Sequence, residues 1–173
     1  MFFSILDSPI GQMVIEANEQ EICAVSFPDE LPLDSPNELS EAAKEQFREY
    51  FEEKRTYFDF PIAQPGTAFQ QKVWNELRKI DAGKPITYAA LAKRMKSPLA
   101  IRAIALANGR NNLMIVIPCH RVIGSNGDLV GFSAGLWRKK WLLEHEARMT
   151  SMGQSVLFVA DQARNDSCGS GLQ

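Results

Sequence analysis

The spacing of the apolar residues changes once along this chain of 173 residues, and that change limits the folds it can adopt. In the first 27 residues they form short runs rich in valine, isoleucine and phenylalanine, interrupted by turn-forming residues, which is typical of β-strands. Beyond residue 38 they recur at every third or fourth position, which is typical of amphipathic helices. The expected strands cover residues 2–6, 12–17 and 22–27. The sequence therefore predicts a mixed α/β (α+β) protein in which a small sheet is followed by helices.

A proline-bearing segment at residues 58–66 follows the first helical stretch and is the best candidate for a linker. Directly after it, Thr67-Ala68-Phe69-Gln70 has the form of a capping box, which opens a helix. We therefore expect a strand-rich N-terminal α/β domain over residues 1–63 and a helical C-terminal domain over residues 67–148. Residues 149–173 end in a stretch rich in serine and glycine, and we expect them to form a mobile tail.

The two parts carry opposite charge, although the whole chain has a formal net charge of −2. Residues 1–70 hold 14 acidic and 4 basic side chains, whereas residues 71–149 hold 5 acidic and 14 basic ones. The second part can therefore approach a polyanion, whereas the total charge alone would argue against a nucleic-acid partner. The other interpretation is a chance segregation of charge over a solvated surface.

Two short helices joined by a tight turn are expected at about residues 87–107. The first begins near Thr87. Ser97-Pro98 predicts the start of the second, because serine is a good N-cap and proline is favoured at the first helical position. Basic residues lie in and after the turn: Lys93, Arg94, Lys96 and Arg102. This arrangement is typical of a DNA-binding helix-turn-helix, although any helical bundle also contains such helix pairs.

Cys119 follows the apolar run 113–117 and is flanked by His120 and Arg121. A free cysteine has a pKa of about 8.5, so a nucleophilic role needs a base or positive neighbours, which these two residues could supply. The alternative is a buried structural cysteine.

The chain has 3 cysteines, lacks a basic signal-peptide start, and contains no apolar run near the roughly 20 residues that span a bilayer. We therefore expect a reducing, cytoplasmic location and no membrane partner.

The segment Ile117-Pro118-Cys119-His120-Arg121-Val122-Ile123 resembles the active-site signature of the O(6)-alkylguanine-DNA alkyltransferases, also called methylated-DNA–protein-cysteine methyltransferases. The resemblance covers residues 1–148 and implies a ribonuclease-H-like N-terminal domain with an antiparallel sheet, followed by a helical domain with a helix-turn-helix. Further motifs fall at family-like spacing: Asp7-Ser8-Pro9-Ile10-Gly11, Phe69-Gln70, Val73-Trp74, Ile86-Thr87-Tyr88, Arg102-Ala103, Asn108-Gly109-Arg110-Asn111 and Trp141-Leu142-Leu143-Glu144-His145-Glu146.

The resemblance implies repair of DNA by direct reversal of damage. The Cys119 thiolate would take the alkyl group from O(6)-alkylguanine, with O(4)-alkylthymine as a further candidate substrate. The resulting thioether has no easy route back, so each protein molecule would act once. Neither a metal nor an organic cofactor is implied. The expected partner is double-stranded DNA that contains alkylated guanine, and the protein is expected to be a monomer without an obligatory protein partner.

The resemblance also implies roles for individual residues. Four belong to the reaction or its support: Cys119 as nucleophile, His120 as the acceptor of its proton through a water, Glu146 as the group that orients the imidazole, and Asn111 as a brace for the active-site turn. Arg102 would fill the stack that the extruded base vacates, while Ser97 and Ser125 would contact phosphates. Tyr88, Phe132 and Ser133 would lie beside the base, with Tyr88 also near its phosphate.

Three positions near the implied site depart from the family pattern. Phe132 stands where tyrosine is usual, so a hydroxyl that could assist the leaving guanine is missing. Ala134 replaces a usual glycine, and Asn112 replaces a usual proline. The N-terminal part contains only Cys23 and no histidine, so the zinc site of some relatives is not expected here.

Two other functions remain open on the sequence alone. One is a lesion-sensing DNA-binding protein that transfers no alkyl group, although the relatives of that kind lack the cysteine. The other is a Cys-His-Glu hydrolase of small substrates, which would leave Arg102 and the helix-turn-helix unexplained. A sequence-specific transcription factor would leave the whole cysteine region unexplained.

Overall fold

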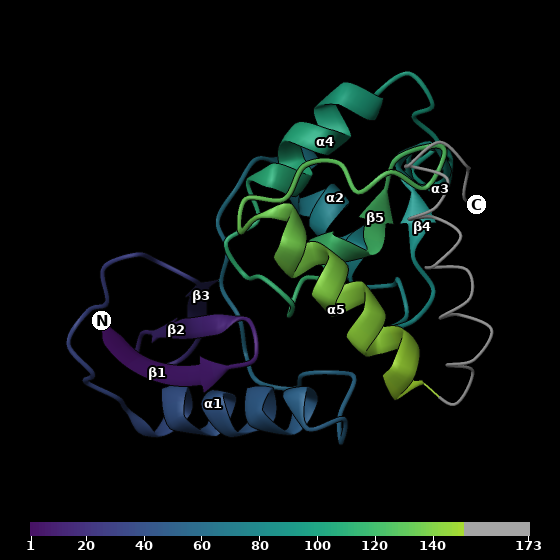
Figure 1. Cartoon of the computed structure of the whole chain (residues 1–173). Coiled ribbons are helices and arrows are strands. Elements are labelled where there is room, and N and C mark those ends of the chain that lie inside the picture. The colour runs from purple at the N-terminus through teal and green to yellow at the C-terminus, as the bar shows by residue number, and fades with distance from the viewer. Residues whose placement is uncertain (151–173) are drawn as a thin grey trace. The chain divides into compact units, whose positions relative to one another are not determined.

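The computed structural model describes residues 1–150 of the chain, which fall into two compact units (Figure 1). The first unit holds Met1–Pro65 together with Asn112–Val116. The second holds Gly66–Asn111 and the chain from Ile117 onward. The tail expected to be mobile lies outside the described residues, except for residues 149 and 150, and so does Cys168.

The first unit is a three-stranded antiparallel sheet with one helix against it (Figure 1). Pro9 and Ile10 form the turn of the first hairpin, in which Ser8 pairs with Gly11, and Gly11 adopts a φ of 112° that suits glycine. The helix packs its buried side chains, among them Phe47 and Tyr50, against the strands. The elements of this unit are β1 (Phe2–Ser8), β2 (Gly11–Ala17), β3 (Ile22–Ser26) and α1 (Glu38–Phe51).

A short stretch of chain shortly before Cys119, residues 112–116, also belongs to this first unit. The amide of Val25 donates to the carbonyl of Asn112 over 2.8 Å, and Val25 forms a parallel bridge with Leu113. Leu113 and Ile115 are buried there, and Ile115 has a φ of 73°, which is unusual for a β-branched residue. The chain therefore leaves the second unit just after Asn111 and re-enters it just before Cys119.

The second unit is mainly helical. Thr67 and Gln70 form the expected capping box at the start of its first helix, and Trp74 in that helix donates to the carbonyl of Ala107 over 2.9 Å. Two short parallel strands pair Ile86 with Val122. The elements are α2 (Ala68–Leu77), β4 (Ile86–Thr87), α3 (Tyr88–Arg94), α4 (Ile101–Gly109), the 3-10 turn η1 (Cys119–Arg121), β5 (Val122–Ile123) and α5 (Leu136–Met149).

The helix-turn-helix is present as α3 and α4, but the start of α4 differs from the sequence prediction. Ser97-Pro98 does not open the helix. The amide of Ala100 instead donates to the carbonyl of Ser97, which closes a separate turn, and α4 begins at Ile101 without a side-chain cap. The helix ends at Gly109, two residues beyond the expected end, and the Asn108 side chain within it makes tertiary hydrogen bonds.

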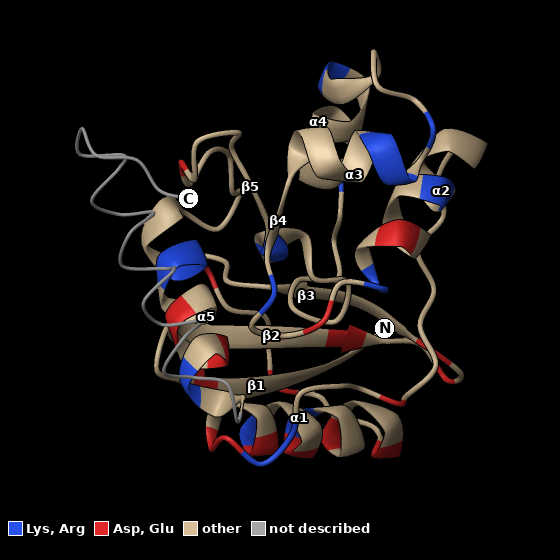
Figure 2. Ribbon diagram, turned by 90° about the vertical axis from the view of Figure 1, so that its right-hand side faces the viewer, with Lys and Arg blue, Asp and Glu red and all other residues tan. Residues whose placement is uncertain are grey.

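Acidic residues are concentrated in the first part of the chain and basic residues in the second, as counted in the sequence. In Figure 2, acidic positions recur along α1, and basic positions lie on α3. In residues 1–150, none of the helices combines the length and apolar character that crossing a lipid bilayer requires.

Candidate active site

Cys119 lies at the first position of η1, directly after Pro118, and only 4% of it is exposed. Its amide donates to the carbonyl of Ile117 over 2.7 Å, so the backbone turns sharply just before the thiol. The residue borders a cavity of about 810 Å³ formed within the second unit. Six residues of its lining matter for the chemistry: Tyr88, Arg102, Asn108, Cys119, Phe132 and Ser133.

His120 and Glu146 form a buried pair next to the nucleophile. Nε2 of His120 lies 2.9 Å from Oε2 of Glu146. Because an ionised carboxylate only accepts hydrogen bonds, Nε2 carries the proton, and Nδ1 is left with its lone pair. Nδ1 is buried and has no hydrogen-bond partner among residues 1–150. Burial lowers the pKa of His120, so the imidazole is neutral at pH 7 and its Nδ1 can accept a proton.

Arg121 holds the other side of the same carboxylate. Its Nε donates to Oε1 of Glu146 and its Nη2 to Oε2, both over 2.8 Å, and its Nη1 donates to the carbonyl of Ile80 over 2.6 Å. Burial alone would raise the pKa of Glu146, but His120 and Arg121 together outweigh it and hold that pKa well below its usual range. The expectation that Arg121 activates the cysteine as a positive neighbour is corrected here: its charge is paired with Glu146.

The resting form of Cys119 is the thiol. Burial raises the pKa of Cys119, and the Asn111 side chain and the positive charge of Lys139 act in the opposite direction without reversing the shift. Asn111 also donates from Nδ2 to the carbonyl of Ile117 over 2.7 Å, so it holds the backbone just before the active-site turn. A base is therefore needed to produce the thiolate, and His120 is adjacent.

Lys139 is a buried residue of this site that the sequence reasoning missed. It is fully buried in α5, and its Nζ donates to the carbonyl of Val130 over 2.8 Å, which ties α5 to the loop that lines the cavity. Burial lowers the pKa of Lys139 to about 8, while the Cys119 thiolate, once formed, acts in the opposite direction. The signal was present in the sequence: Lys139, Leu142 and Glu146 share one face of the helix by their spacing.

Tyr88 and Asn108 meet at the cavity. Nδ2 of Asn108 donates to the Tyr88 hydroxyl over 3.0 Å and approaches the carbonyl of Cys119 at 3.4 Å. Burial raises the pKa of Tyr88 to about 12, so its hydroxyl is protonated at neutral pH. Tyr88 was expected at the site from the sequence, whereas Asn108 was not.

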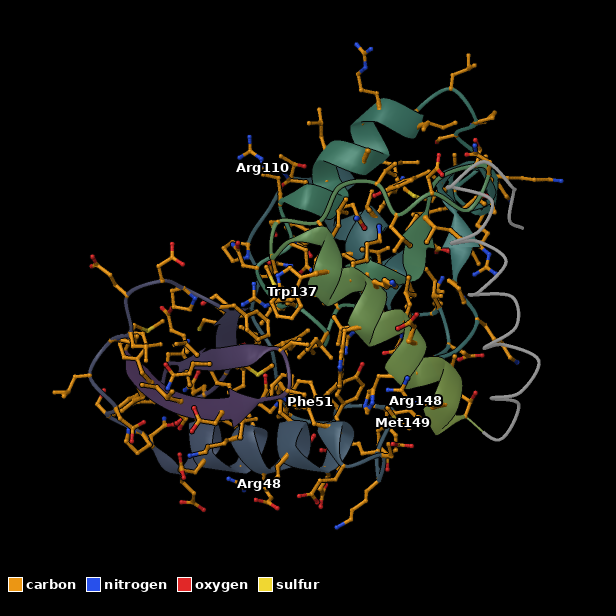
Figure 3. All side chains as sticks on the ribbon, in the orientation of Figure 1. Arg48, Phe51, Arg110, Trp137, Arg148 and Met149 are labelled. Atoms are coloured by element: carbon orange, nitrogen blue, oxygen red, sulfur yellow. The ribbon has the colours of Figure 1, made fainter. Side chains whose placement is uncertain are left out.

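The remaining expected residues lie at the surface of the same unit. Arg102 is exposed on α4 and borders the cavity, whereas Ser97 and Ser125 lie in turns away from its lining. Phe132 is half-buried and Ser133 exposed, both in the lining loop. Arg110 is exposed just after α4, and its side chain points away from the helix (Figure 3).

Comparisons with known proteins place this geometry in a family. The family model described as 6-O-methylguanine DNA methyltransferase, DNA binding domain, matches residues 68–148. The model of the ribonuclease-like domain of the same enzymes matches residues 1–64. The three-stranded sheet with its helix and the following helical unit agree with the fold that the sequence predicts.

Relatives match over most of their length. A methylated-DNA–protein-cysteine methyltransferase of Methanosarcina acetivorans is 39% identical over 153 residues, which cover 84% of this chain and 98% of the relative. The constitutive enzyme of Bacillus subtilis is 39% identical over 144 residues, covering 76% of this chain and 86% of that protein. A crystal structure of Mycobacterium tuberculosis OGT in complex with DNA superposes with a TM-score of 0.79 at 34% identity, covering 91% of this chain and 99% of that one. The chain therefore belongs to the 6-O-methylguanine DNA methyltransferase family.

Proposed function

We propose that this protein repairs DNA by moving the alkyl group of O(6)-alkylguanine to Cys119, once per protein molecule. The observation that carries the proposal is the juxtaposition of three groups. The thiol of Cys119 borders a cavity large enough for a base, Nδ1 of the adjacent His120 has no hydrogen-bond partner among residues 1–150, and Glu146 holds the opposite nitrogen of that ring.

The reaction begins with a proton transfer from Sγ of Cys119 to Nδ1 of His120, through one water. The imidazolium that forms is stabilised by the ionised Glu146, which Arg121 keeps charged. The sulfur electron pair then attacks the alkyl carbon bound to O(6). As the S–C bond forms, the C–O bond breaks and its electron pair passes into the guanine ring. The guanine then takes up a proton from water, and the imidazolium of His120 gives its extra proton back to water. The products are an S-alkylcysteine and an unmodified guanine.

The helix-turn-helix supplies the contact with DNA. Arg102 is exposed on α4 at the border of the cavity, where its planar cation can enter the stack that the extruded base leaves. Extrusion costs a few kcal/mol, which contacts of this kind must offset. Ser97 and Ser125 are assigned to phosphates. Contacts with the sugar-phosphate backbone of DNA carry no sequence information, which suits a protein that acts on a damaged base in any DNA sequence.

The extruded base occupies the cavity, and the residues in and near its lining have different roles. Tyr88 supplies a protonated hydroxyl, and Ser133 and Phe132 come from the opposite loop. Asn111 keeps the turn before Cys119 in place. O(4)-alkylthymine is a second candidate base for the same chemistry. Because the thiol must stay reduced, we assign the protein to the cytoplasm.

The experiment is a transfer assay with a duplex that carries one O(6)-methylguanine. Mass spectrometry should find one added methyl group on the Cys119 peptide, at most one per protein molecule. Cys119→Ser should transfer nothing, and Cys23→Ser serves as the matched control that should transfer as the wild type does. Binding of the lesion without an adduct would instead identify a sensor, and repeated turnover on small substrates a hydrolase; either result overturns the proposal.

A further inference from the structure

Asn108 connects three parts of the site. It lies in the last turn of α4, the helix that also carries Arg102, and only 4% of it is exposed. Its Nδ2 donates to the hydroxyl of Tyr88 at the start of α3 over 3.0 Å, and approaches the backbone carbonyl of Cys119 at 3.4 Å. One amide group therefore joins the DNA-binding helix, the cavity tyrosine and the backbone of the nucleophile.

These contacts fix which way the amide faces. The carbonyl of Cys119 can only accept a hydrogen bond, so the nitrogen of Asn108, and not its oxygen, must face it. The opposite orientation would bring two oxygen atoms together. The same nitrogen also faces the Tyr88 hydroxyl and donates its second hydrogen there. Oδ1 of Asn108 is left buried without a partner among residues 1–150, a cost that stability alone does not explain.

The orientation of the Asn108 amide determines whether the Tyr88 hydroxyl can donate its proton to another group. A hydroxyl has one proton to donate, and because the Tyr88 oxygen accepts from Asn108, that proton is free for another acceptor. Tyr88, Asn108 and Cys119 all border the same cavity. A base in the cavity is the acceptor that the geometry offers.

We propose that Asn108 is a positioning residue for alkyl transfer, which holds the Tyr88 hydroxyl as a hydrogen-bond donor to the base in the cavity. This inference rests on the proposed function. It matters for the reaction because the guanine ring gains negative charge as the C–O bond breaks, and a donor oriented in advance stabilises that charge. Asn108 acts through Tyr88 and makes no contact with the reacting atoms itself.

A double-mutant cycle tests the connection. Asn108→Leu removes the amide at similar volume, Tyr88→Phe removes the hydroxyl, and the third variant combines both in the full chain. Single-turnover transfer is measured against DNA concentration, so that the maximal rate is separated from the half-saturating concentration. Removal of one oriented donor costs about 100- to 1000-fold in rate, so we expect Tyr88→Phe near that range and Asn108→Leu, which only releases the donor, near about tenfold.

The expected signature is non-additivity. Asn108→Leu should lower the maximal rate with little change in half-saturation, and should have almost no further effect once Tyr88 is phenylalanine. Reaction of Cys119 with iodoacetamide, which has no guanine to leave, should be unchanged by Asn108→Leu. Effects that multiply in the double variant, or an equal loss with iodoacetamide, would overturn the inference and identify a structural role.

Two further outcomes are distinguishable. If the wild type transfers no alkyl group, the proposed function fails and this inference with it. If the wild type transfers but the cycle is additive, only the inference fails. Asn108→Ala is the second variant, and replaces Asn108→Leu in the cycle if the leucine variant does not fold.

Discussion

Nε2 of His120 and Oε2 of Glu146 lie 2.9 Å apart with both side chains buried, and this contact determines which nitrogen of the imidazole can act as a base. Without the carboxylate, the ring proton could sit on either nitrogen. With it, the proton stays on Nε2, and Nδ1 keeps a lone pair that no residue of 1–150 uses. The carboxylate is also held by Arg121, so two consecutive residues of η1, His120 and Arg121, hold the same carboxylate.

Glu146→Gln should reduce both transfer and stability. The amide cannot stabilise an imidazolium, and Arg121 is left as a buried cation without its counter-charge, for which the free energy of unfolding should fall by about 3–5 kcal/mol. Denaturant unfolding and single-turnover transfer measure the two effects. Glu76→Gln is the matched control, because Glu76 pairs with Lys79 at the surface and such pairs contribute about 0–1 kcal/mol. Equal losses in the two variants would contradict the buried network.

Lys139 should make stability rise with pH in the alkaline range. Its pKa is about 8 when folded and about 10.4 in an unfolded chain, so between these values the unfolded state binds more protons. The contribution of Lys139 to the free energy of unfolding should therefore increase as the pH rises from 8 towards 10.4, whereas Cys119, whose pKa burial raises, contributes in the opposite direction. Relative to Lys139→Met, the wild type should show this increase. Lys140→Met, at an exposed position of the same helix, is the control and should keep it. A rise that survives in Lys139→Met would exclude this residue as its source.

Phe132→Tyr should speed alkyl transfer. Phe132 borders the cavity and offers the leaving guanine no hydrogen bond, whereas a tyrosine hydroxyl at this position can donate one as negative charge develops. The single-turnover rate on duplex DNA with O(6)-methylguanine is the measurement. An unchanged or lower rate would show that the missing hydroxyl does not limit the reaction.

Arg102→Ala should slow transfer far more on duplex DNA than on the free O(6)-alkylated base. Only the duplex requires extrusion of the base, and Arg102 is an exposed cation of α4 that borders the cavity. Arg110→Ala removes the same charge from an exposed position just after α4, outside the cavity lining, and should have a small effect. A similar loss on both substrates would place Arg102 in the chemistry and not in extrusion.

Binding of undamaged duplex DNA should weaken as salt increases. The basic second half of the chain neutralises phosphates and releases counterions, so the logarithm of the binding constant should fall linearly with the logarithm of the salt concentration. Fluorescence anisotropy over a salt series measures the slope. A binding constant independent of salt would exclude the electrostatic contact that the charge distribution predicts.

Local patterns of the sequence predicted most of the fold. The runs of valine, isoleucine and phenylalanine form the three strands, and Thr67 and Gln70 cap α2 as their spacing indicates. The predicted start of α4 was wrong, because Ser97-Pro98 forms part of a separate turn and the helix begins at Ile101. The same local preference fits a turn and a helix start equally well, and only the packing of α3 against α4 decides between them.

The candidate site was likewise predicted only in part from the sequence. The motif around Cys119 and its resemblance to a family named the nucleophile, its neighbouring histidine and a distant glutamate. Neither the motif nor the resemblance could show that Arg121 pairs with Glu146, or that Lys139 and Asn108 are buried beside the site.

By itself, the sequence determined which chemistry this protein has available: one thiol next to an imidazole, in the basic half of a chain whose other half is acidic. The tertiary structure decided how these groups are charged and aimed. The physical reason is burial. Once His120, Glu146, Lys139 and Asn108 lose water, each must find partners within the protein, and those partners belong to other helices, turns or loops of the fold. Such pairings depend on how α3, α4, α5 and η1 meet, and spacing along the sequence does not contain that information.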